Sequence, residues 1–286
     1  MNRKVIPLCL LALLPWSPVG AEPSFNVATL TVMPEFADKA ANYAVFERLA
    51  RQAAAAGADL VVTTEGFLDG YLGDSTRMTR EQMPGHAEPI DGPWLRKVAA
   101  LARELKIHVI IGFAELRDGK VYNTAALFGP DGALVGRYRK THLAGGESEL
   151  FEHGRELPVF DTALGRMGIL ICFDRRPPEN ARVLALQGAQ FIVVPAYGKR
   201  STPLDEDILM QARAQENGIY MIYTTPYNAV AVDPEGEIYS KVSGPASELM
   251  FARVDLDPAK LGDRAIRERH PDLYRLLAEK LRPREP

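Results

Sequence analysis

The stretch MGILICFDRRPPE, residues 167–179, joins an apolar run to a cysteine, a charged turn and two prolines. The apolar run predicts a buried strand, and the prolines predict the start of a helix that runs from about Glu179 to Gln187. A cysteine at such a strand-to-helix turn would expose its sulfur at the sheet edge, where helix-start N–H groups can face a developing oxyanion. That setting also predicts a lowered thiol pKa. The local sequence fits a buried structural cysteine at position 172 equally well.

Strand-like and helix-like segments alternate outward from this stretch. Strands are predicted at Phe25–Val32, Leu60–Val62, Ile107–Ala114, Arg166–Cys172, Phe191–Pro195 and Ile219–Thr225, with helices after Asp38, from Pro93, over Glu179–Gln187 and over Asp205–Asn217. Turn sequences at residues 129–132 and 233–236 predict two hairpins. The pattern indicates a mixed sheet with helices packed outside it, in one α/β domain over residues 22–286 without an internal boundary.

The composition limits the partners. The chain has 286 residues, 47% of them hydrophobic and 25% charged, which are ordinary globular values. Its formal net charge of −3 offers no basic field for nucleic acid or an anionic membrane surface. We therefore expect a small-molecule partner, and no nucleic acid. Since the sequence has neither a glycine-rich phosphate loop nor a His/Cys ligand cluster, we expect no cofactor and no metal.

Residues 1–21 have the pattern of a signal peptide. Arg3 and Lys4 precede an apolar run from Val5 to Leu14, and small residues lead to a cleavage site after Ala21. The run is too short to span a bilayer. We expect an exported protein, periplasmic or secreted, without a membrane association after cleavage; an uncleaved anchor is the alternative. Cleavage would remove Cys9, so Cys172 would be the one thiol left and no intrachain disulfide could form.

A nucleophilic thiol needs a base or a cation beside it. None of the five histidines stands in a strand-end or turn context with an orienting acid, which leaves charged residues at strand ends. Glu65 follows the apolar strand Leu60–Val62, where partial burial would raise its pKa toward neutrality; a water-facing loop glutamate fits as well. Lys140 also follows a strand and could stabilise an oxyanion. It could equally belong to a solvated cluster with Arg137 and Arg139.

Five motifs in order resemble the nitrilase superfamily of carbon–nitrogen hydrolases over residues 25–277. They surround Glu65, Lys140 and Cys172, and continue in the segments Gln211–Asn217 and Arg269–Tyr274. The resemblance implies a four-layer α-β-β-α sandwich and a covalent two-step mechanism. In that mechanism Cys172 attacks, Glu65 is the general base, and Lys140 and the backbone N–H of Phe173 hold the oxyanion.

The resemblance also implies supporting residues. Glu147 would position Lys140, with Glu149 as the second choice. The sequence Cys172-Phe173-Asp174-Arg175-Arg176 is similar to the cysteine motif of N-carbamoyl-D-amino-acid amidohydrolases, so Arg175 and Arg176 could bind a substrate carboxylate. A salt bridge from either arginine is an equal alternative. Family resemblance further implies a homodimer or higher homo-oligomer, with the C-terminal helical segment at an interface.

The expected activity is cleavage of a non-peptide C–N bond in a small linear amide or N-carbamoyl compound through a cysteine thioester. Ammonia or an amine would be released. Two other enzymatic activities fit the same residues, namely nitrile hydrolysis and acyl transfer to an amine. A binding protein that kept the fold without catalysis is a third alternative, which the intact set of Glu65, Lys140 and Cys172 disfavours.

Overall fold

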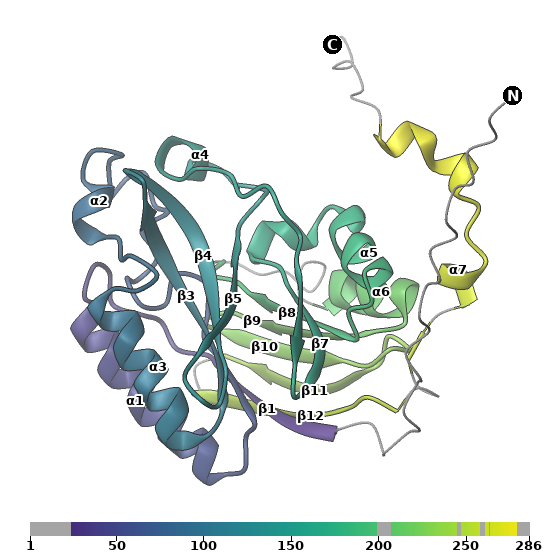
Figure 1. Ribbon diagram of the computed structural model, residues 1–286, viewed down its shortest axis with the longest axis horizontal. Helices are drawn as coiled ribbons and strands as arrows, with labels where there is room; N and C mark the ends of the chain where they lie inside the picture. The colour runs from purple at the N-terminus through teal and green to yellow at the C-terminus, as the bar shows by residue number, and fades with distance from the viewer. Residues whose placement is uncertain (1–23, 199–206, 245–246, 258–260, 263, 279–286) are drawn as a thin grey trace, which may run out of the picture.

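Two six-stranded sheets form the centre of the computed structural model (Figure 1), which describes residues 24–198, 207–244, 247–257, 261–262 and 264–278. Residues 1–21, expected to be a signal peptide, lie outside the described residues. The first sheet has the order β12 (Leu249–Asp255), β1 (Ser24–Leu30), β2 (Leu60–Val62), β3 (His108–Arg117), β4 (Lys120–Phe128) and β5 (Leu134–Arg139). The second has the order β11 (Ile238–Ser243), β10 (Asn228–Val232), β9 (Tyr220–Thr224), β8 (Phe191–Pro195), β7 (Gly165–Ile169) and β6 (Val159–Thr162).

Neighbouring residues of the central strands belong to two different hydrophobic clusters, and this shows how the two sheets pack face to face. Val27, Leu60 and Val62 belong to the cluster that also contains the strands of the second sheet. Their neighbours Ala28 and Val61 belong to the cluster that contains the helices over the first sheet. Because successive side chains of a strand point to opposite faces, the central strands of the first sheet are buried on both sides.

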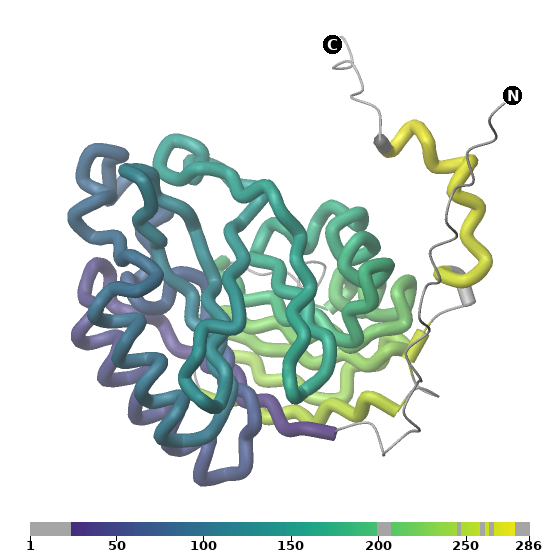
Figure 2. Tube along the Cα trace, in the orientation of Figure 1, coloured from purple at the N-terminus to yellow at the C-terminus, as the bar shows by residue number. Residues whose placement is uncertain are grey.

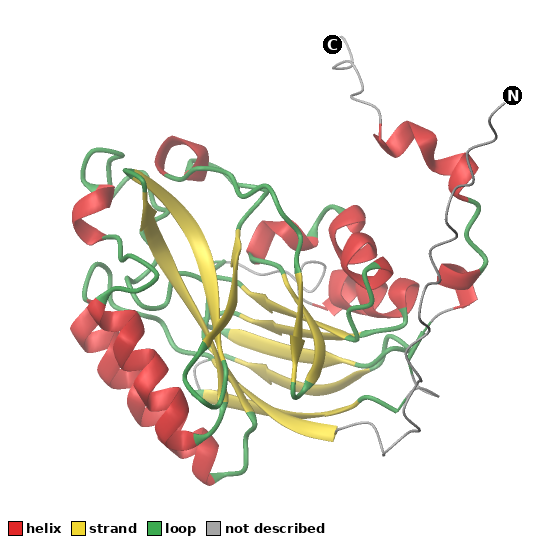
Figure 3. Cartoon of the chain, in the orientation of Figure 1, coloured by secondary structure: helices red, strands yellow, loops and turns green. Residues whose placement is uncertain are grey.

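Helices cover the outer face of each sheet (Figure 3). The pair α1 (Lys39–Ala55) and α3 (Pro93–Leu105) lies on the first sheet, and the pair α5 (Pro178–Leu186) and α6 (Leu209–Asn217) lies on the second. Asp38 accepts a hydrogen bond from the Ala41 N–H at 2.9 Å, so it caps α1 as the sequence predicts. The layers therefore stack as α-β-β-α, which confirms the expected four-layer sandwich.

Short helical segments complete the chain: α2 (Met83–His86), α4 (Glu147–Leu150), the 3₁₀ helix η1 (Cys172–Arg175), α7 (Arg264–Arg267) and the 3₁₀ helix η3 (Pro271–Ala278). Figure 2 shows α7 and η3 extending away from the sheets. In the described part of the chain, no helix is long and apolar enough to cross a bilayer.

The central strands place several loops at one end of the sandwich. In the first sheet β1, β2 and β3 are parallel, and in the second β7, β8 and β9 are parallel. Glu65 follows β2, Lys140 follows β5, and Cys172 follows β7. In open α/β sheets, ligands bind at the carboxyl ends of the strands, so these three positions mark the end to examine.

Candidate active site

Lys140 connects two buried carboxylates. Its Nζ lies 2.8 Å from Oε1 of Glu65, and 2.9 and 2.6 Å from the two carboxylate oxygens of Glu147. All three side chains are almost completely buried. Burial alone lowers the pKa of Lys140, but the charges of Glu65, Cys172 and Glu147 together raise it above the ordinary lysine value. The ammonium group therefore stays charged at neutral pH, and this lysine is not part of a solvated basic cluster.

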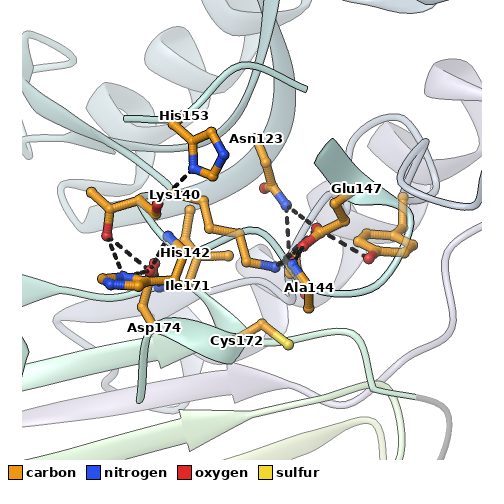
Figure 4. Close-up of polar contacts among 12 residues, drawn as sticks. Asn123, Lys140, His142, Ala144, Glu147, His153, Ile171, Cys172 and Asp174 are labelled. Carbon is orange, nitrogen blue, oxygen red and sulfur yellow. Dashed lines mark hydrogen bonds and ion pairs between the residues drawn. The ribbon is translucent and has the colours of Figure 1, made fainter. Parts of the chain in front are cut away.

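Glu147 is held by groups from three other segments. Its Oε1 accepts hydrogen bonds from Nδ2 of Asn123 and from the hydroxyl of Tyr71, each at 3.1 Å, and its Oε2 accepts one from the Ala144 N–H at 2.7 Å. Figure 4 shows the Lys140 side chain ending beside Asn123, Ala144 and Glu147. Glu149 lies on the same short helix but is exposed. The structure thus places Glu147, and not Glu149, against Lys140.

Glu65 has one satisfied and one unsatisfied carboxylate oxygen. Oε1 receives the Lys140 and Asn123 hydrogen bonds, both at 2.8 Å. Oε2 is buried and has no hydrogen-bond partner among the residues that the structure describes. Burial raises the pKa of Glu65, against the lowering effect of Lys140. A buried, unpartnered oxygen on a carboxylate of raised pKa is well suited to accept a proton.

Close backbone packing fixes the loop that carries Glu65. A Cβ atom at Gly112 on β3 would lie 2.4 Å from the carbonyl oxygen of Thr64, so only glycine lets β3 approach this loop. The Glu65 N–H also donates to the carbonyl of Ala196, which follows β8 in the other sheet, at 3.4 Å. The position of Glu65 is therefore set by both sheets.

Cys172 occupies a strained turn. Strand β7 ends at Ile169, earlier than the sequence predicts, and Cys172 begins the 3₁₀ helix η1 with φ of +49°. A non-glycine residue in this left-handed region costs free energy, and such strain clusters at functional sites. Cys172 as a whole residue is half-buried.

The thiol of Cys172 is not acidified by its surroundings. Burial and the charge of Glu65 raise its pKa to about 11, against the opposing charges of Lys140 and Arg175. The sequence-based expectation of a lowered pKa is therefore wrong. The start of a helix lowers the pKa of a thiol, but here burial and the nearby carboxylate of Glu65 raise it by more. A thiol that is protonated at neutral pH needs a base to become nucleophilic, and Glu65 is close enough for its charge to act on the thiol.

Asp174 connects the nucleophile turn to the loop that carries Lys140. Its fully buried carboxylate accepts hydrogen bonds from the Ile171 and His142 N–H groups at 3.1 and 2.8 Å, and from the Tyr138 hydroxyl at 2.7 Å. The His142 ring lies 3.1 Å from the same carboxylate (Figure 4). The expectation that no histidine has an orienting acid is therefore wrong, because the fold brings Asp174 to His142 from 32 residues away.

The two arginines after the nucleophile lie in different places. Arg175 is buried, and its Nη1 donates to the Cys172 carbonyl at 2.7 Å and lies 3.7 Å from the sulfur. Arg176 is exposed, with its guanidinium 5.6 Å from the ring centroid of Phe173. Their suggested role in binding a substrate carboxylate stays a prediction.

Phe173 is the second residue of η1, so its N–H is in the first turn, where no intrahelical acceptor exists.

The sequence interpretation missed Asn123, Tyr71, Asp174 and Tyr197. Asn123 is a buried amide in strand β4, next to Thr124 and just before an apolar run, and this buried polar position is the available signal. Tyr71 and Tyr197 stack at a ring-centroid distance of 4.2 Å, and nothing in their local sequences marks them as partners. Asp174 stands inside the cysteine motif, but the motif alone gives it no role. Within the described residues, no group of three His, Cys, Asp or Glu side chains could hold a metal ion.

Comparisons with known proteins agree with this geometry. The family described as carbon-nitrogen hydrolase matches residues 26–261. Omega-amidase NIT2 of Bos taurus is 32% identical over 261 residues, which cover 81% of this chain and 90% of the relative. A protein named nitrilase from Pyrococcus abyssi is 34% identical over 249 residues, with the same shares covered.

The fold has solved relatives too. The crystal structure of an amidase from Nesterenkonia sp. superimposes with a TM-score of 0.76 at 23% identity, over 91% of this chain and 98% of that one. Another structure of it is described as a member of the nitrilase superfamily. The sequence matches cover most of the chain and include all three loops that meet around Lys140. This chain belongs to the carbon–nitrogen hydrolase family of the nitrilase superfamily.

Proposed function

We propose that this enzyme hydrolyses the C–N bond of small linear amides or N-carbamoyl compounds through a thioester on Cys172, releasing ammonia or an amine. The observation that carries the proposal is the buried ammonium of Lys140 between Glu65 and Glu147, beside the single described cysteine. The name omega-amidase, borne by relatives above 30% identity, supports an amide as the substrate.

Acylation begins with proton transfer from the Cys172 thiol to Oε2 of Glu65, the oxygen without a described partner. The sulfur attacks the amide carbon, and the new oxyanion is held by the Lys140 ammonium and the Phe173 N–H. The C–N bond then breaks, and the leaving nitrogen takes the proton from Glu65. Ammonia or an amine departs, and the acyl group remains on sulfur.

Deacylation uses the same groups with water as the nucleophile. Glu65 takes a proton from the water, which attacks the thioester carbon, and the same donors hold the oxyanion. The C–S bond breaks and the thiolate recovers the proton from Glu65, which leaves a carboxylic acid as the product. Glu147 keeps Lys140 in position through both steps by its two short contacts to Nζ.

The test measures ammonia released from a panel of small amides, carbamoyl amino acids and nitriles, together with intact-protein mass. A saturable substrate and an acyl adduct on Cys172 are expected, and Cys172→Ala should abolish both. Glu147→Gln should lower kcat about 100-fold by weakening the hold on Lys140. The matched control is Glu149→Gln on the same helix, which should stay within about twofold because that side chain is exposed. Equal losses in the two variants would contradict the assigned role of Glu147.

The same experiment separates the alternatives. One relative bears the name nitrilase, so nitriles belong in the panel; a nitrile-only enzyme would release no ammonia from amides. Acyl transfer would give an N-substituted amide when hydroxylamine is added, in place of the acid. A binding protein without catalysis would give neither ammonia nor an adduct from any compound.

We also propose export after cleavage behind Ala21, on the pattern of residues 1–21. N-terminal sequencing of the protein from the periplasm or culture medium tests this. A mature chain that still begins at Met1 would contradict it.

We further propose that the chain forms a homo-oligomer through its C-terminal segment. Leu273, Leu276 and Leu277 on η3 are each about two-thirds exposed, at 69%, 64% and 66%. Contiguous exposed apolar residues indicate an interaction surface. Light scattering should give a dimer or larger for the intact chain, and a smaller species when the three leucines are changed to serine.

A further inference from the structure

A cavity lies away from the candidate active site, at the β5 edge of the first sheet. Its volume is about 550 Å³, within the range of roughly 300–1,000 Å³ typical of small-molecule sites. Four arginines contribute to its lining, namely Arg117, Arg137, Arg139 and Arg155. Neither Glu65, Lys140 nor Cys172 lines it.

Strand register explains why the arginines gather there. Arg137 and Arg139 are two residues apart on β5, so they share a face. Arg139 is paired with Thr124 of β4, and Tyr122 of β4 is paired with Glu115 of β3. These side chains therefore lie on one face of the sheet. Lys140, just after the strand, is turned the other way into the candidate active site.

A buried carboxylate holds two of the arginines in place. Glu115, which is 1% exposed, accepts hydrogen bonds from Nη2 and Nε of Arg139 at 2.7 and 2.8 Å and lies 3.2 Å from Nε of Arg137. One carboxylate thus orients two guanidinium groups and neutralises only one of them. Preorganised donors of this kind bind a ligand at a lower entropic cost than mobile side chains do.

The rest of the wall supplies charge and apolar surface. Arg155 has no hydrogen bond or ion pair among the described residues, and Arg117 makes an exposed pair with Asp118 at 3.3 Å. Exposed pairs of this type contribute little, so Arg117 can exchange partners. The ring of Tyr122 lies 4.3 Å below the Arg139 guanidinium, and Phe160 lines the other side. Even with Glu115, Glu156 and Asp118 counted, positive charges outnumber negative ones.

We propose that this arginine pocket binds a small organic anion that carries a carboxylate or phosphate group on a short apolar body. Guanidinium groups pair with both oxyanions through paired N–H donors, and the aromatic rings suit an apolar body. The pocket is separate from the catalytic end but adjoins its backbone, because the N–H of Gly154 in the pocket wall donates to the Lys140 carbonyl at 2.8 Å. The neighbouring His153 lies beside this loop in Figure 4.

The test titrates the full chain with succinate and, separately, with glycerol 3-phosphate in a calorimeter. At least one of the two should bind saturably at one site per chain, and the compound that binds identifies a carboxylate or a phosphate ligand. Binding should persist after alkylation of Cys172 by iodoacetamide, which separates this site from the catalytic one. The experiment measures binding alone, so its result does not depend on whether the enzyme hydrolyses amides.

Two substitutions localise the binding. Arg155→Glu reverses the charge of an exposed residue and should leave folding intact. Arg137→Gln removes one guanidinium group but keeps the contact between Arg139 and Glu115. Each substitution should weaken binding about tenfold or more, because a charge-assisted contact to the ligand is lost. Arg96→Glu on α3 is the matched control and should bind as the wild type does. Absence of saturable binding by both compounds up to about 10 mM, or unchanged affinity in both pocket variants, would overturn the proposal.

Discussion

The carboxylate of Asp174 accepts a hydrogen bond from the backbone N–H of His142 at 2.8 Å, and this contact joins two loops that the sequence separates. His142 stands two residues after Lys140, and Asp174 stands two residues after Cys172. The same carboxylate receives the Ile171 N–H at 3.1 Å, so one buried group sets the spacing of both loops. Asp174 is thus a positioning residue for the ammonium and the thiol.

Replacing Asp174 with asparagine should reduce both stability and activity. Each of its carboxylate oxygens accepts hydrogen bonds, and the amide NH₂ that replaces one oxygen would face donors. An unmet buried donor costs about 1–3 kcal/mol, measurable by urea unfolding. A displacement of the catalytic groups by about 1 Å can cost 100-fold in kcat. KM should change less than kcat, because the substrate contacts stay in place.

The control for this substitution is Asp161→Asn on β6, an exposed aspartate paired with Arg166 at 3.0 Å. Its unfolding free energy should stay within about 0.5 kcal/mol of the wild type, and its kcat should not change. A kcat for Asp174→Asn equal to that of Asp161→Asn would show that Asp174 does not position the catalytic groups.

The pair of His142 and Asp174 should make stability depend on pH. The hydrogen bond to Asp174 raises the pKa of His142 above its unfolded value, near 6.5. The stabilisation is therefore complete below the unfolded pKa and is lost as the pH rises through the folded pKa. Between pH 5.5 and pH 8.5, the urea midpoint of unfolding should fall further in the wild type than in His142→Asn. Equal shifts in the two proteins would show that the folded-state pKa of this histidine is ordinary.

The sequence predicted which residues end strands, but not how those ends are shaped. Glu65 and Cys172 follow apolar runs, and such runs are visible without a structure. The run before Cys172 overstates the strand, because Leu170 and Ile171 are buried beyond its end. Hydrogen bonding ends β7 there, since the Ile171 N–H turns to the side chain of Asp174. An apolar run predicts that its residues are buried, but it does not show that the Ile171 N–H changes its hydrogen-bond acceptor.

The contacts that arrange the site were beyond prediction from one sequence. Asn123 reaches Glu65 across 58 residues and Glu147 across 24. Such pairs depend on the register of β4 and on which sheet face each loop crosses, and local periodicity specifies neither. The four-layer arrangement came from family resemblance, because alternating strands and helices indicate only a mixed sheet with covering helices.

Arg175 and Arg176 should respond differently to substitution. Arg175 contacts the carbonyl and the sulfur of Cys172, so Arg175→Gln should lower kcat for charged and neutral amides alike. If Arg176 binds a substrate carboxylate, Arg176→Ala should raise KM for acidic amides about tenfold and leave neutral amides unchanged. Steady-state kinetics on an amide of each type gives both parameters. Equal KM changes for the two amides would contradict carboxylate recognition by Arg176.

Removing the ammonium of Lys140 should destabilise the protein in a pH-dependent way. Lys140→Met leaves Glu65 and Glu147 buried without their shared cation, and breaking such a pair costs about 3–5 kcal/mol. Burial then raises the pKa of Glu65 without the opposing charge of Lys140, so the folded state of the variant binds more protons than its unfolded state and is stabilised as the pH falls. The loss relative to the wild type should thus be greatest at pH 8 and smaller at pH 5, by urea unfolding. Lys120→Met, an exposed control on β4, should lose about 0.5 kcal/mol or less at both pH values. A pH-independent loss in Lys140→Met would mean that Lys140 does not lower the pKa of Glu65.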